Sequence, residues 1–140
     1  MGALLSLLLG FKMYVKQYHW MARGYENHIL ADELEKELDD YIDEAAELHN
    51  INEDTQEGDS QLFADNILFS ARNSVSDKYR GNDMNLTLDS LLQLAGSIIQ
   101  ECSLKPGAEG ATEQAFGDYY GRLSNLMVRK CYLINLQRRK

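Results

Sequence analysis

Apolar residues recur three or four positions apart along most of this chain, which is the spacing of one face of an α-helix. The pattern breaks at Gly24 and again over residues 105–110, where the single proline lies. No segment alternates between apolar and polar residues as a strand does. We therefore predict an all-α chain with helices over residues 3–22, 26 to about 50, 61–79, 87–102 and 112–136.

Four of these helices can form one bundle, with residues 61–79 crossing between the second and third bundle helices. A bundle with one long crossover is the ferritin-like arrangement. The 140 residues are enough for one domain with a hydrophobic core, so we predict a single domain over 1–140. Thr87 has the residue type of a helix N-cap, and we expect it to begin the helix that follows.

The chain is acidic, with a net charge of −8 and a pI of about 4.8. This balance argues against non-specific binding to nucleic acid, which needs a basic surface, and suits a protein that attracts cations. The basic run 138–140 is expected to be a solvated end rather than a DNA-binding arm.

The N-terminal stretch 1–9 is apolar but short, and it is followed by Lys12 and Lys16 without a preceding positive region. We therefore expect a buried helix rather than a signal peptide or a membrane span. Cys102 and Cys131 lie on different predicted helices and have no zinc-binding spacing. We expect them to be reduced and at least partly buried, which is consistent with a cytoplasmic location.

The strongest chemical signal lies on the second predicted helix and just before it. His28/Asp32 and Asp43/Glu47 are each spaced four apart, so each pair shares a helix surface, and His19 lies upstream. At about 100° per residue all four helix residues fall on one stripe. Imidazoles and carboxylates together suit Fe(II), Mn(II) or Zn(II).

A solvated acidic face is the alternative explanation for this stripe. Glu35 and Asp39 lie near it, between the two pairs. Their side chains could guide ions or face water, and we expect them to face water. An acidic stripe alone would indicate nothing more, but the added histidines favour a metal site.

One chain cannot close a site from both pairs, because Asp32 and Asp43 would lie about 16 Å apart along the helix axis. Two antiparallel copies of the helix can, with a twofold axis near residues 37 and 38. His28 would then face Glu47 of the partner subunit, and Asp32 would face Asp43 of the partner subunit. The Glu-x-x-His motif of intrachain di-iron bundles is absent from the sequence. The spacing therefore predicts a metal site shared between subunits and formed twice per dimer.

Three sequence segments resemble the Dps family, the miniferritins also described as DNA-binding proteins from starved cells. They are Tyr-His-Trp-Met-Ala-Arg-Gly at 18–24, His-Ile-Leu-Ala-Asp-Glu-Leu at 28–34, and Leu-Asp-Asp-Tyr-Ile-Asp-Glu-Ala-Ala-Glu at 38–47. The His-Trp pair, the His-x-x-x-Asp spacing and the Asp-Glu-x-Ala-Glu element match the family's ferroxidase pattern. A weaker similarity covers 86–136.

The resemblance implies that His19, His28 and Asp32 bind iron from one subunit, and that Asp43 and Glu47 bind it from the twofold-related partner. It also implies a homo-oligomer, a hollow dodecamer of tetrahedral symmetry built from dimers.

The function implied by the resemblance is ferroxidase activity and iron storage. Fe(II) would be oxidised by hydrogen peroxide or dioxygen and kept as ferric oxide, which protects against oxidative stress. The alternatives are a non-catalytic helical-bundle protein of assembly, or a DNA-protecting protein. Tyr18 and Trp20 flank His19, and we expect at least one of them to pack in the core.

Overall fold

A computed structural model describes residues 2–53, 84–104 and 111–139 of the chain. These residues form four helices and contain no strand: α1 (Gly2–Met21), α2 (Tyr25–Glu53), α4 (Met84–Leu104) and α5 (Ala111–Arg139). The prediction of an all-α chain is confirmed for this part of the molecule. The predicted helix over 61–79 lies outside the described residues.

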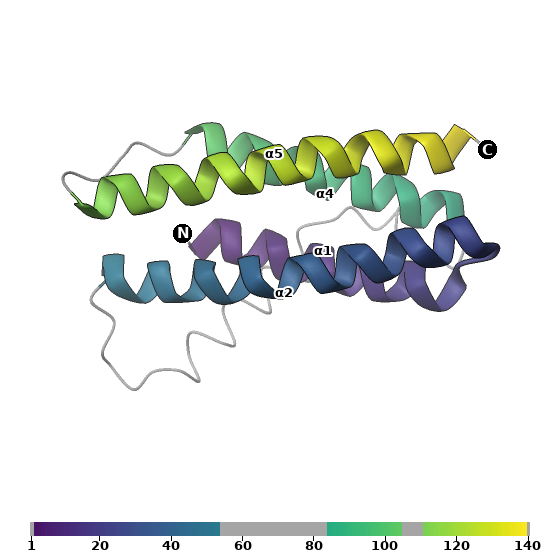
Figure 1. Cartoon of the computed structure of the whole chain (residues 1–140), viewed down its shortest axis with the longest axis horizontal. Coiled ribbons are helices and arrows are strands. Elements are labelled where there is room, and N and C mark those ends of the chain that lie inside the picture. Colours follow the sequence, from purple (N-terminus) through teal and green to yellow (C-terminus); the bar gives the residue numbers. More distant parts are fainter. Residues whose placement is uncertain (1, 54–83, 105–110, 140) are drawn as a thin grey trace.

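The four helices pack side by side as a bundle (Figure 1). α1 and α2 form one antiparallel pair, and α4 and α5 form another. α1 also packs against α4, while α2 packs more sparsely against α5. α2 and α4 run in the same direction along the bundle (Figure 1).

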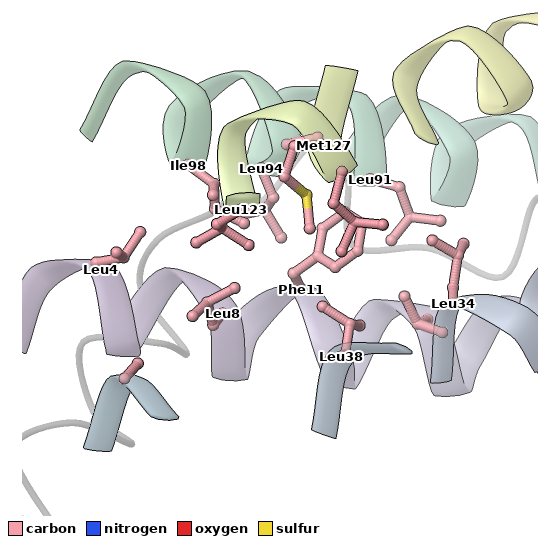
Figure 2. Close-up of a cluster of buried hydrophobic side chains, with 14 of the residues drawn as sticks. Leu4, Leu8, Phe11, Leu34, Leu38, Leu91, Leu94, Ile98, Leu123 and Met127 are labelled. Atoms are coloured by element: carbon pink, nitrogen blue, oxygen red, sulfur yellow. The ribbon is translucent and has the colours of Figure 1, made fainter. Parts of the chain in front are cut away.

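The core lies between the helices, and the periodic apolar residues of each helix point into it (Figure 2). Burial of such side chains stabilises the fold by roughly 1.5–3 kcal/mol each relative to exposure. The residues labelled there are Leu4, Leu8, Phe11, Leu34, Leu38, Leu91, Leu94, Ile98, Leu123 and Met127.

A short turn joins α1 to α2 and fixes how their ends meet. Gly24 has a φ of 85°, a left-handed conformation that favours glycine. Asn27 then ties the turn to both helices: its Nδ2 donates to the Arg23 carbonyl at 2.9 Å, and its Oδ1 accepts a hydrogen bond from the Tyr18 hydroxyl. The turn therefore holds the last residues of α1 against the first residues of α2.

Tyr18 is fully buried, which confirms that one of the two aromatics beside His19 packs in the core. Trp20 is 79% exposed and does not. Cys102 is buried on α4 and Cys131 is half-buried on α5, both as free thiols, as expected. Within the described helices, no stretch is both long and apolar enough to cross a membrane.

The prediction that Thr87 begins a helix is wrong. α4 already begins at Met84, and Thr87 is fully buried within its first turn. Its Oγ1 lies 3.7 Å from the Sδ of Met21, at the end of α1. Thr87 therefore packs against α1 inside the helix and does not cap its N-terminus.

A polar cluster joins α2 to α5. The Tyr119 hydroxyl donates to the Tyr41 carbonyl at 2.8 Å, and the Arg122 guanidinium donates to both Glu44 carboxylate oxygens at 3.1 and 2.6 Å. Tyr119 itself is fully buried, so its hydrogen bond satisfies a polar atom inside the bundle. These contacts set the register of α5 along α2.

Candidate metal centre

His19 and His28 meet at the turn between the first two helices. His19 lies in the last turn of α1, and His28 lies in the first turn of α2. Because the turn between them is short, their rings come into edge-to-face contact, with centroids 4.6 Å apart and planes at 66°. Two imidazoles predicted to share a site are therefore adjacent in the folded chain.

Asp32 lies one helical turn beyond His28 on α2, with 42% of its side chain exposed. The Lys36 ammonium lies 3.0 Å from its Oδ2. This hydrogen bond lowers the pKa of Asp32, and the positive charges of Lys36 and of the two histidines act in the same direction against desolvation. Asp32 is thus an ionised carboxylate within electrostatic reach of both His19 and His28.

Glu35 does not face water as predicted. Its side chain is only 22% exposed, and its Oε1 lies 3.1 Å from the Nδ1 of His19 and 4.0 Å from the ammonium of Lys16. The reason is the packing of α1 on α2, which brings the side of α2 that carries Glu35 against α1. Asp39 is 58% exposed but also reaches across to α1, where it pairs with Lys12.

Asp43 and Glu47 are exposed on the outer side of α2. At about 1.5 Å per residue, Asp43 lies about 16 Å from Asp32 along the helix axis. The folded chain therefore does not bring this pair to the histidines.

The single chain assembles part of the predicted site. Among residues 2–53, 84–104 and 111–139, no three His, Cys, Asp or Glu side chains lie together in a way that could hold a metal ion. His19, His28 and Asp32 are neighbours, but Lys36 occupies one side of the carboxylate. The donor set of two imidazoles and a carboxylate fits a first-row divalent metal in its chemistry.

No family model matches the chain, and no curated protein or solved structure matches it either. The resemblance to the Dps family therefore stays a prediction, and the function has to be argued from the site itself.

Two residues of this cluster, Lys36 and Glu35, were not predicted to belong to it. Lys36 could have been found, because it lies four residues after Asp32 and opposite charges at that spacing pair on a helix. Glu35 contacts His19 across two helices, and no spacing within one helix indicates such a contact.

Proposed function

We propose that this protein is an iron-oxidising and iron-storing miniferritin with a Dps-like, ferritin-like fold. The observation that carries the proposal is the contact between the His19 and His28 rings at the α1–α2 turn, with the Asp32 carboxylate one helical turn beyond His28. Mixed imidazole and carboxylate donors bind Fe(II), and they do so without the thiolates that select softer metals.

The directions of the helices support the ferritin-like part of the proposal. In Figure 1, α1 and α2 are antiparallel, α2 and α4 are parallel, and α4 and α5 are antiparallel. A four-helix bundle with one long crossover, between its second and third helices, has this order. In a bundle whose loops are all short, each helix would be antiparallel to the helix before it.

The exposure of Asp43 and Glu47 supports a site completed by a second subunit. Both carboxylates lie on the outside of α2, where an antiparallel α2 of a partner can reach them. Twofold symmetry would then bring them to the His19, His28 and Asp32 of the partner subunit, and the same pairing would recur on the other side of the axis. Such dimers are the units from which we expect a dodecamer to form.

In this proposal Fe(II) is the substrate. Two Fe(II) ions each give one electron to one molecule of hydrogen peroxide, whose O–O bond breaks and which takes up two protons to form two molecules of water. The carboxylates stabilise the product, because Fe(III) prefers hard anionic oxygen ligands. The net charge of −8 favours accumulation of the cations and of their hydrolysed oxide.

The test is the rate of Fe(II) oxidation after hydrogen peroxide is added under anaerobic conditions. We expect rapid oxidation by the wild-type protein and a rate near the protein-free control for Asp43→Ala/Glu47→Ala. Asp118→Ala is the control, because it removes an exposed carboxylate of α5, away from α2, and should keep the wild-type rate. If wild type and Asp43→Ala/Glu47→Ala both react at the protein-free rate, the chain is a non-catalytic assembly protein instead.

A further inference from the structure

The Glu35 carboxylate of α2 contacts His19 of α1, one of the proposed iron ligands. Its Oε1 lies 3.1 Å from the Nδ1 of His19, and the ammonium of Lys16 lies 4.0 Å from the same oxygen. Glu35 is mostly covered by α1, so this contact is sheltered from solvent more than the neighbouring pair of Lys12 with Asp39.

We infer that Glu35 is a positioning residue for His19. With its Oε1 3.1 Å from Nδ1, it favours a proton on that nitrogen and therefore the tautomer in which Nε2 carries the free lone pair. The role of that lone pair as an iron ligand rests on the proposed function, whereas the choice of tautomer does not.

The physical basis is the asymmetry of the imidazole ring. A neutral histidine carries one N–H, and the hydrogen bond made by one nitrogen decides whether the other can bind a metal. Metal-binding histidines usually donate their second nitrogen to a carboxylate or a carbonyl in this way. The ammonium of Lys16 lies 4.0 Å from the same Glu35 oxygen, so two residues of α1 face the acceptor.

Partly exposed ion pairs contribute little to the stability of a folded protein. The effect of Glu35 should therefore appear in the state of the His19 ring and in metal affinity more than in stability. The neighbouring pair of Lys12 with Asp39 provides a natural comparison, since it joins the same two helices without contacting a histidine.

The first experiment measures the His19 tautomer by long-range ¹H–¹⁵N correlation spectra of the metal-free protein. It is recorded at about pH 8, above the ordinary histidine pKa of about 6.5. We expect the Nδ1–H tautomer in wild type and in Glu35→Gln, whose amide oxygen can still accept. In Glu35→Met we expect a shift toward Nε2–H, and in Asp39→Leu no change. An Nε2–H tautomer in wild type, or an unchanged tautomer in Glu35→Met, would overturn the inference.

The second experiment measures Zn(II) binding to the same metal-free proteins by calorimetry. Loss of a carboxylate that orients a metal-binding histidine typically weakens affinity by about 10–100-fold, and we expect this for Glu35→Met. Glu35→Gln should recover most of the affinity. Equal affinity of Glu35→Met and wild type would refute the positioning role.

These results separate the inference from the proposed function. A Glu35-dependent Nδ1–H tautomer in a protein that does not oxidise iron would support the positioning role and reject the ferroxidase. Iron oxidation by a protein whose His19 is in the Nε2–H form would do the reverse.

Discussion

Mixing two defective variants tests whether the proposed iron site takes its residues from two subunits. His28→Ala/Asp32→Ala removes the part near the α1–α2 turn, and Asp43→Ala/Glu47→Ala removes the exposed part of α2. Each variant alone should be inactive. Because the two parts lie about 16 Å apart on one helix, no chain can supply both to one ion.

The expected recovery follows from random pairing around the twofold axis. In an equal mixture of the two variants, about half of the dimers contain one chain of each kind. One of the two sites in such a dimer combines the unaltered turn residues of one chain with the unaltered Asp43 and Glu47 of the other, so about 25% of all sites are intact. A mixture of wild type with a chain carrying all four alanines should also keep about 25%. If each site lay within one chain, these mixtures would instead keep none and about 50% of the activity.

The assay is the anaerobic rate of Fe(II) oxidation by hydrogen peroxide, normalised to total chain. The two chains are co-expressed with different affinity tags, and native mass spectrometry of doubly tagged protein establishes that mixed assemblies have formed. No recovery in doubly tagged protein made from the two defective variants would refute the shared site.

Three further predictions concern stability and reactivity. Gly24→Ala should lower the free energy of unfolding by about 1–2 kcal/mol in a urea titration, because alanine disfavours a φ of 85° while its Cβ meets open space. Gly24→Asn should cost less, and equal costs for both variants would contradict the backbone explanation. Tyr119→Phe removes the hydrogen bond to Tyr41 but keeps the buried ring, so we expect a loss of about 0.5–1.5 kcal/mol in the same titration; no change would indicate that this bond does not support the α2–α5 contact. Burial raises the pKa of Cys102 to about 11, so the thiolate is scarce at neutral pH and its reaction with a disulfide reagent should speed up as the pH rises toward 11; a fast reaction of the folded protein at pH 7 would contradict this.

The helices could be predicted from the sequence because their apolar period is also the pattern of the core. Residues such as Leu91, Leu94 and Ile98 are spaced for one helix face, and all three are buried. The predicted first and second helices, 3–22 and 26 to about 50, agree closely with Gly2–Met21 and Tyr25–Glu53.

The start of α4 could not be predicted in the same way. Thr87 has a residue type that favours a helix N-cap, and that local preference indicated the wrong starting residue. Its burial against Met21 depends on how α1 and α4 pack, and this information is not local in the sequence.

The site was predictable to the extent that it lies on one helix. The spacing of His28 and Asp32 placed them together, and the same rule would have added Lys36. The contact of Glu35 with His19 depends on the register between α1 and α2, which the turn at Gly24 and the packing of the two helices determine.

The outer side of α2 gives a physical reason for a cation to bind there. Asp39, Asp40, Asp43 and Glu47 are all exposed on it, and like charges four apart on a helix each cost a few tenths of a kcal/mol. Lys12 from α1 offsets this repulsion at Asp39. Toward the far end of α2, a divalent ion shared with the histidines of a partner subunit would relieve the repulsion between Asp43 and Glu47. Metal binding and subunit pairing would then favour each other, because the cation lowers the cost of bringing two acidic helices together.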